Sequence, residues 1–189
     1  IRHGIARDEI VRLATEIQAD AVFFNHDDDP AALARDSAVE ATLQQLGIAV
    51  HHFKDTVIFE REEVLTGAGK PFSIFTPYKN AWLKALAPFY LRAYPVDAYV
   101  DRLAAQSSAI PRLQDMGFAP TNLRELKLPT GMSGGARLFE DFLQRIDRYQ
   151  ETRDFPAIKG PSYLSVHLRF GTVSIRQLAA AAWQQGGRG

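Results

Sequence analysis

The first 53 residues alternate between two hydrophobic periodicities, and this alternation limits the fold more than any other feature. Apolar residues recur at helical spacing over 7–19 and 31–46, and each stretch leads into a short apolar run, 21–24 and then 48–53. Gly47 is expected to end the second helix as its C′ residue. Helix, strand, helix, strand with short joins is typical of an α/β layer built from βαβ units. We therefore predict a parallel sheet, whose first strand is buried on both faces because it is apolar throughout.

Beyond residue 60 the sheet-like periodicity is lost. The cluster 66–71 is a turn rather than a phosphate loop, because the Walker spacing is not met. Thr76 and Pro77 predict a helix start, and the helix body has four apolar residues that we expect in the core: Trp82, Leu83, Leu86 and Phe89. Four Pro and four Gly between residues 94 and 135 indicate an inter-domain connection, with one short helix near 96–105.

Helical spacing returns at residue 136 and continues to Tyr149, so the second region is predicted to be all-helical. Another short helix is expected near residues 160–162. Its first turn would offer backbone N–H groups and the hydroxyls of Ser162 and Ser165 to an anion. A last helix is expected at Ser174, where Ser-Ile-Arg-Gln fits a capping box.

The charges are balanced overall but not along the chain. Residues 1–123 carry 12 basic and 16 acidic side chains, whereas residues 124–189 carry 10 and 6. Zero net charge argues against a protein that coats nucleic acid, yet the basic second region is better placed to meet phosphate. The uneven distribution of charge is explained equally well by chance together with solvated helix faces.

Composition excludes several kinds of site. With no Cys, the chain has no disulfide, no zinc ribbon and no thiol nucleophile, and its five scattered His residues suggest no metal site. The absence of Cys is typical of a reducing compartment, so we expect a cytoplasmic protein. No apolar run approaches the roughly 18 residues of a membrane span, so we expect no membrane partner.

Polar residues follow the first predicted strand, where parallel sheets bind ligands. Asn25, His26 and three consecutive Asp residues, 27–29, occupy this strand end. They could bind a cation, hydrogen-bond a heterocycle or cap the next helix. Capping is the most common of these roles for Asp and Asn.

Several motifs, taken together and in order, resemble the photolyase/cryptochrome family. The run Tyr149-x-x-x-Arg153-Asp154-Phe155-Pro156 and residues 160–177 resemble the opening of the family's flavin-binding helical domain. Phe24-Asn25, Ala34-Arg35-Asp36, Val64-Leu65-Thr66 and residues 75–82 look like the α/β antenna domain. The likeness is strongest to the bacterial class I enzymes that repair cyclobutane pyrimidine dimers.

The resemblance assigns roles to residues of this chain. It implies that FAD is held by Tyr149, Ser162, Leu164 and Ser165, and that Arg153 contacts the DNA backbone. Asn25 and Asp29 match antenna-domain positions. Folate-binding members have a Glu at the position of Asp29, and this Glu hydrogen-bonds the pterin. The resemblance therefore allows a methenyltetrahydrofolate antenna without requiring one. The resemblance assigns no catalytic or metal-binding residue in this chain.

Alternatives and departures accompany these assignments. Arg153 could instead form a surface ion pair with Asp154 or Glu151, and His26, Asp27 and Asp28 are expected to face solvent. Pro161 stands where the family usually has Thr, which removes one hydroxyl and one N–H, and Tyr163 stands where a polar residue is common.

The implied activity is light-dependent splitting of cyclobutane pyrimidine dimers in damaged DNA by electron transfer from reduced FAD. The enzyme would be a monomeric carbon–carbon lyase. The implied domains are an incomplete α/β antenna domain over 1–86, a connector over 87–135 and the start of the helical FAD domain over 136–189. We expect these 189 residues alone to be inactive, because the family's first strand and most of its flavin pocket lie outside them.

Two other functions remain open. A cryptochrome-type blue-light photoreceptor has the same architecture. A small α/β nucleotide-binding protein would use the strand end from Asn25 to Asp29.

Overall fold

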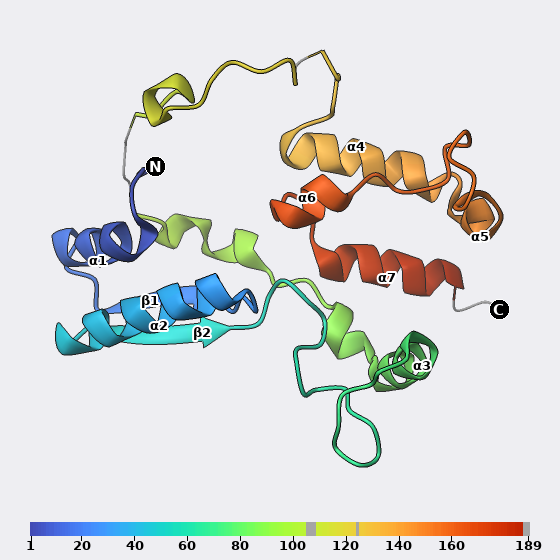
Figure 1. Ribbon diagram of the computed structural model, residues 1–189, viewed down its shortest axis with the longest axis horizontal. Helices are drawn as coiled ribbons and strands as arrows, with labels where there is room; N and C mark the ends of the chain where they lie inside the picture. Colours follow the sequence, from blue (N-terminus) through green and yellow to red (C-terminus); the bar gives the residue numbers. More distant parts are fainter. Residues whose placement is uncertain (105–108, 124, 187–189) are drawn as a thin grey trace. The chain divides into compact units, whose positions relative to one another are not determined.

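The computed structural model describes residues 1–104, 109–123 and 125–186 (Figure 1). The chain divides into two compact units, and each is described by itself. The first contains Ile1–Thr56 and Asp101–Pro120, and the second contains Val57–Val100 and Thr121–Gly189.

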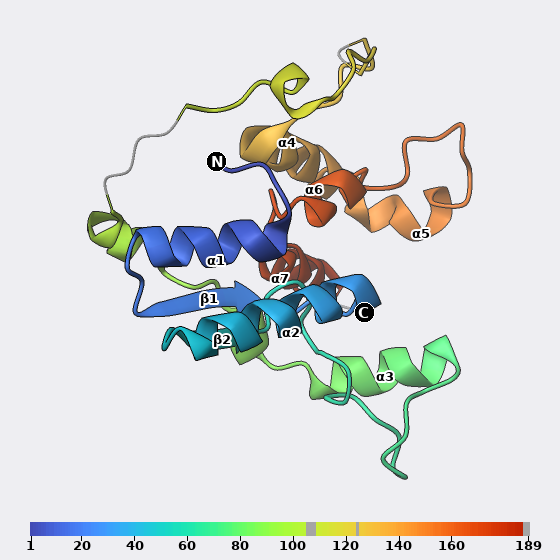
Figure 2. The same cartoon turned by 60° about the vertical axis from the view of Figure 1, so that its left-hand side comes forward.

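The first unit is built on one βαβ motif with a preceding helix. Its elements are α1 (Ala6–Glu16), β1 (Ala21–Asn25), α2 (Pro30–Gln45) and β2 (Ala49–Phe53). The strands are parallel, with Ala21 opposite Ala49 and Asn25 opposite Phe53 (Figure 2). The predicted α/β class and parallel pairing are confirmed.

One face of this sheet carries the core of the unit. Val39 and Leu43 of α2 are almost completely buried, and they pack with Ala14 of α1 against partly buried side chains of both strands. Phe23 is 63% exposed, because alternate strand residues point away from the helices. The prediction that the first strand is buried on both faces is therefore wrong. Phe23 instead stacks on His51, with 4.8 Å between the ring centroids.

The ends of α2 explain its length. The Oδ1 of Asp29 accepts hydrogen bonds from the N–H groups of Ala31 (2.8 Å) and Ala32 (3.3 Å), which caps the first turn. At the other end Gly47 has a φ of 77°, and the N–H of Ile48 bonds to the carbonyl of Leu43 at 2.9 Å. This is a Schellman ending, and it confirms the predicted role of Gly47.

All regular secondary structure in the described residues of the second unit is helical, as predicted for the region from residue 136. Its elements are α3 (Phe75–Ala85), η1 (Pro88–Leu91), α4 (Gly131–Leu143), η4 (Ile146–Arg148), α5 (Tyr149–Thr152), α6 (Ser165–Arg169) and α7 (Ile175–Gly186). Of two further 3₁₀ turns, η2 (Val96–Arg102), near the expected short helix, has residues in both units, and η3 (Gln114–Met116) belongs to the first.

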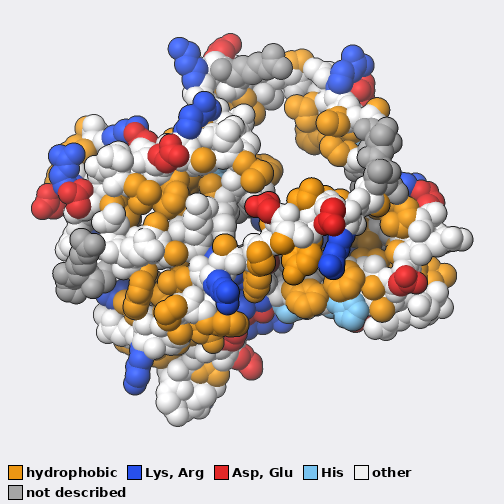
Figure 3. All heavy atoms as spheres, turned by 180° about the vertical axis from the view of Figure 1, so that it is seen from behind, with side chains coloured by type: hydrophobic (Ala, Val, Ile, Leu, Met, Phe, Trp, Pro, Cys, Tyr) orange, Lys and Arg blue, Asp and Glu red, His pale blue; other side chains and the backbone are white. Residues whose placement is uncertain are grey.

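Helix α3 differs from its prediction at both ends. It begins at Phe75 rather than Thr76, so Pro77 is its third residue, and it ends at Ala85 before Pro88. Phe89 therefore lies in a separate 3₁₀ turn and is exposed, as is Leu83, whereas Trp82 and Leu86 are half-buried. These four side chains do not form the expected core. Figure 3 shows in orange the apolar side chains that reach one face of the molecule.

Helix α4 begins five residues before the predicted start, because two of its glycines pack closely. A Cβ on Gly134 would lie 2.6 Å from the carbonyl carbon of Pro129, and one on Gly135 would lie 2.6 Å from Cγ1 of Val173. The predicted single helix to Tyr149 is instead divided into α4, η4 and α5. In a sequence, a Gly pair is usually interpreted as a helix break. Here the absence of Cβ atoms lets α4 approach Pro129 and Val173 closely.

Helix α6 begins at Ser165, later than the expected 160–162, so Ser162 precedes the helix. Its His167 is 3% exposed, and the Nδ1 of His167 lies 2.7 Å from the Oγ1 of Thr172. The Oγ of Ser174 accepts from the N–H of Gln177 at 3.4 Å, in agreement with the predicted cap of α7.

We expect Gly135→Ala to lower the free energy of unfolding of the second unit by about 1–3 kcal/mol, since the added methyl group overpacks Val173 and His167. Chemical denaturation followed by Trp fluorescence measures this, because Trp82 and Trp183 both lie in that unit. Gly186→Ala is the matched control: its Cβ meets nothing within 4 Å, so stability should be unchanged or slightly higher. Equal stability of both variants would contradict the packing.

Asp29→Ala should cost about 1 kcal/mol of stability in the first unit, because it removes the cap of α2. Asp29→Asn and Asp29→Ser retain a capping oxygen and should cost little. Denaturant-dependent amide exchange within α2 is the measurement. A cost for Asp29→Asn as large as that of Asp29→Ala would exclude capping as the cause.

Candidate functional site

The segment that carries most of the predicted site residues runs from Tyr149 to Ser165. Tyr149 opens the short helix α5, and Ser165 opens α6. Between them, Gly160 is buried against the end of α5: a Cβ at this position would lie 2.6 Å from the carbonyl oxygen of Thr152 and 3.0 Å from Cα of Arg153. The chain that leads to Ser162 therefore starts in direct contact with the backbone next to Arg153.

Residues 162–165 form a tight turn before α6. The Oγ of Ser162 accepts a hydrogen bond from the N–H of Leu164 at 3.4 Å. A hydroxyl that accepts in this way keeps its own proton to donate to another acceptor. Tyr163 has a φ of 58°, which is uncommon for a residue other than Gly and is often found at functional sites.

Leu164 and Ser165, the two other predicted FAD-binding residues of this segment, differ in the groups that they can offer to a ligand. The side chain of Leu164 is buried, with 3% of the residue exposed, so Leu164 can meet a ligand only through its main chain. Ser165 is exposed at the first position of α6, where N–H groups lack helical acceptors. The turn thus offers hydroxyl and amide donors, a set that suits a phosphate oxygen.

Tyr149 and Arg153 lie together on α5 and just after it. The guanidinium carbon of Arg153 is 5.8 Å from the centre of the Tyr149 ring, which also meets Phe142 edge-on at 5.9 Å. The Nε of Arg153 lies 3.6 Å from Oδ2 of Asp154, so the predicted ion-pair alternative is present. Both side chains are at least half exposed, and such pairs contribute only about 0–1 kcal/mol, which leaves Arg153 able to meet another anion.

A largely buried arginine, Arg145, supports this region. The Nη1 of Arg145 donates to the carbonyl oxygens of Lys159 and Gly160, both at 2.7 Å. Asp141 accepts from Lys159 Nζ at 2.8 Å and from Arg145 Nη2 at 3.1 Å. These two cations hold the pKa of Asp141 below its ordinary value. The Asp141–Arg145 spacing of i, i+4 was the only sequence signal for this network.

The strand-end residues of the first unit already have local partners. Nδ2 of Asn25 donates to Oδ2 of Asp55 at 3.4 Å, and the Oδ1 of Asp27 accepts from the N–H of Asp29 at 3.0 Å. Asp29 caps α2 through its Oδ1, so the capping alternative is confirmed for this residue. Its Oδ2 remains the oxygen that could meet a ligand.

The expectation that His26 faces solvent is wrong, whereas Asp27 and Asp28 are exposed as predicted. His26 is half-buried and stacks on His52 at 5.8 Å between ring centroids. The N–H of His26 extends the pairing of the strands by donating to the carbonyl of Phe53 at 2.9 Å, which draws the ring toward β2.

Two kinds of site are absent from the described part of the chain. No group of three or more His, Cys, Asp or Glu residues there is placed to hold a metal ion. None of the helices formed by residues 1–104, 109–123 and 125–186 combines the length and apolar character needed to cross a membrane.

Comparisons with family models, curated sequences and solved structures all find photolyases or cryptochromes. The DNA photolyase family model matches residues 1–100. A deoxyribodipyrimidine photo-lyase from Halobacterium salinarum is 33% identical over 186 residues, which cover 96% of this chain and 38% of that protein. The chain thus spans well under half the length of this relative.

Two solved structures share the fold. A bacterial class III photolyase from Agrobacterium tumefaciens superposes with a TM-score of 0.74 at 26% identity, over 95% of this chain and 38% of that one. A cryptochrome from Synechocystis superposes with a TM-score of 0.67 at 15% identity, over 94% and 38%. With its family model matched over more than half its length, this chain belongs to the DNA photolyase family.

Proposed function

We propose that the protein containing this chain is a deoxyribodipyrimidine photolyase that repairs cyclobutane pyrimidine dimers in light. The observation that carries the proposal is the match to a deoxyribodipyrimidine photo-lyase along 96% of the chain, which includes the hydroxyl-bearing turn at 162–165. The protein would act as a cytoplasmic monomer on damaged DNA, and its resemblance is to the class I enzymes.

FAD is the cofactor that fits the 149–165 segment. The hydroxyls of Ser162 and Ser165 would hold its diphosphate, with Tyr149 beside them, and the N–H of Leu164 would join them by exchanging its long 3.4 Å bond to Ser162 for a phosphate oxygen. Pro161 supplies no N–H, so the amides that follow it carry more of the phosphate binding. When bound and reduced, FAD supplies a light-driven electron to the dimer. The residues of this chain bind and orient that cofactor.

Arg153 is proposed to bind a DNA phosphate beside the lesion. Its half-exposed guanidinium is held over Tyr149, and its ion pair with Asp154 is weak enough to be exchanged for a phosphate. Phosphate contacts position a protein on the duplex, and unstacking is least costly at a damaged base. The excess of basic over acidic side chains in residues 124–189 also favours DNA binding by this part of the chain.

An antenna pterin would meet Asn25 and Asp29 at the strand end. Asp29 keeps one carboxylate oxygen beyond the capping bond, and Asn25 has an amide oxygen that its bond to Asp55 does not use. These groups can hydrogen-bond a heterocycle such as methenyltetrahydrofolate.

The decisive assay is light-dependent loss of dimers from damaged DNA by the natural polypeptide that contains this sequence. Under reducing conditions, we expect loss in blue light and none in the dark. A flavin-loaded protein that changes its own absorbance in light without removing dimers would indicate the cryptochrome alternative instead.

Replacing the two hydroxyls, Ser162→Ala with Ser165→Ala, should raise the dissociation constant for FAD at least tenfold, because each loses a hydrogen bond to charged phosphate worth about 1.5–3 kcal/mol. Flavin absorbance after gel filtration measures retention. Ser133→Ala, at an exposed position of α4, is the control and should retain FAD.

The small nucleotide-binding alternative makes the opposite prediction. In that case Asn25→Ala or Asp29→Asn would abolish ligand binding, and changes at Tyr149 and Ser162 would not. We expect instead that the Asp29→Asn protein keeps its FAD.

A further inference from the structure

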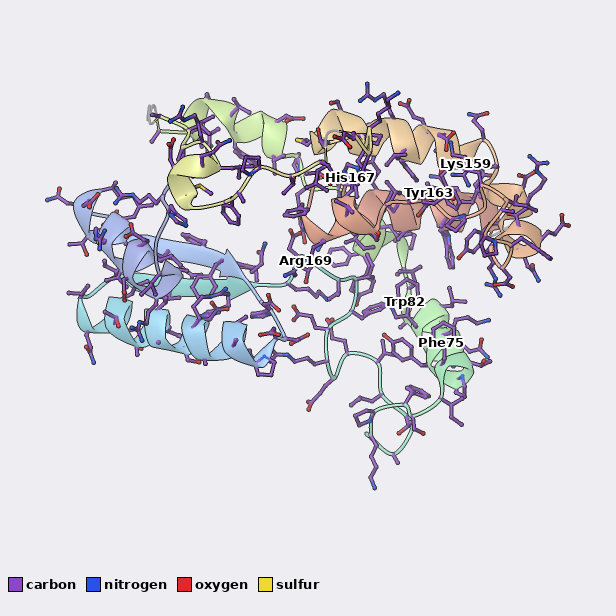
Figure 4. The ribbon with its side chains drawn as sticks, turned by 45° about the horizontal axis from the view of Figure 1, so that its top comes forward. Phe75, Trp82, Lys159, Tyr163, His167 and Arg169 are labelled. Atoms are coloured by element: carbon purple, nitrogen blue, oxygen red, sulfur yellow. The ribbon has the colours of Figure 1, made fainter. Side chains whose placement is uncertain are left out.

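We propose that Arg145 is a positioning residue for the cofactor turn: its guanidinium holds the main chain at 159–160 and thereby fixes the 162–165 turn on which FAD binding depends. This inference rests on the proposed FAD site and deepens it. The segment from Lys159 through Tyr163 to His167 can be followed in Figure 4.

The placement of Arg145 follows from the break between α4 and η4. Helix α4 ends at Leu143, and Arg145 has a φ of −140° and a ψ of 7°, outside the helical region. This turn directs the side chain away from the solvated face on which helical spacing would place it. The side chain is only 13% exposed, and the ring of Phe142 lies 5.2 Å from its guanidinium carbon.

The contacts of Arg145 are suited to holding a loop. One nitrogen, Nη1, uses its two protons on the adjacent carbonyls of Lys159 and Gly160, and the other, Nη2, binds Asp141. A planar guanidinium makes such contacts with little freedom of angle. Asp141 also binds Lys159 Nζ at 2.8 Å, so the loop is held through both its main chain and a side chain.

The held carbonyls are next to the functional turn. Gly160 is buried against Thr152 and Arg153, with no room for a Cβ, and Ser162 follows two residues later. Arg145 therefore acts on one end of a short segment whose other end is anchored by the buried Leu164. Between these two anchors lie the groups that would face the diphosphate.

The first test is amide hydrogen exchange of the natural polypeptide without FAD, for wild type and Arg145→Met. We expect faster exchange between residues 159 and 165, and unchanged exchange within α7. Unchanged exchange at 159–165 would overturn the proposal. Equal acceleration in α4, α6 and α7 would also overturn it, because Arg145 would then only stabilise the unit as a whole.

The second test is FAD affinity of the same proteins. We expect the dissociation constant to rise about tenfold for Arg145→Met, which corresponds to about 1.4 kcal/mol, and less for Arg145→Lys, which keeps the charge beside Asp141 but not the planar fork. Arg137→Met, at an exposed position of α4, should bind FAD like wild type. An unchanged affinity for Arg145→Met would refute the link to the cofactor.

The two tests separate this inference from the proposed function. If wild-type protein binds no FAD, the proposed function fails, while the exchange experiment still decides whether Arg145 holds the segment. Gly160→Ala provides a second route to the same displacement, since its methyl group would push the chain from Thr152 without removing a charge. Faster exchange at 159–165 is expected there too, and its absence would contradict the close packing.

Discussion

The second unit depends on close approaches of the main chain that only glycine permits. Gly134 meets the backbone of Pro129, Gly135 meets the side chains of Val173 and His167, and Gly160 meets the backbone of Thr152 and Arg153. The first two set where α4 starts and how it packs on α6 and on Val173, which precedes α7. The third holds Gly160, two residues before Ser162, against the end of α5 next to Arg153.

The two candidate sites differ in how much of their bonding capacity is already used. At the strand end, Asp29 caps α2 and Asn25 is bonded to Asp55, so both serve the fold before they serve a ligand. In the 162–165 turn the bond from Leu164 to Ser162 is long, and the hydroxyl protons of Ser162 and of the exposed Ser165 remain for an external acceptor. This asymmetry favours the turn as the site that binds tightly.

Hydrophobic periodicity was sufficient to predict the parallel pair, α2 and its endings, because these depend on local signals such as the Asp29 cap and Gly47. It failed at Phe23, since a run of apolar residues does not say which strand face is covered. It also failed at Gly135, whose role depends on His167 and Val173, 32 and 38 positions later in the sequence. Arg145 was missed for a related reason: its burial follows from a helix break that the pattern of apolar residues does not reveal.

The central claim is that FAD binds at the turn before α6, and amide hydrogen exchange with and without FAD tests it most directly. We predict that FAD added to the natural polypeptide slows exchange at the amides of residues 162–167 and next to Tyr149. Protection confined to residues 25–31, at the end of β1 and the start of α2, would contradict this account and would place the nucleotide site in the first unit.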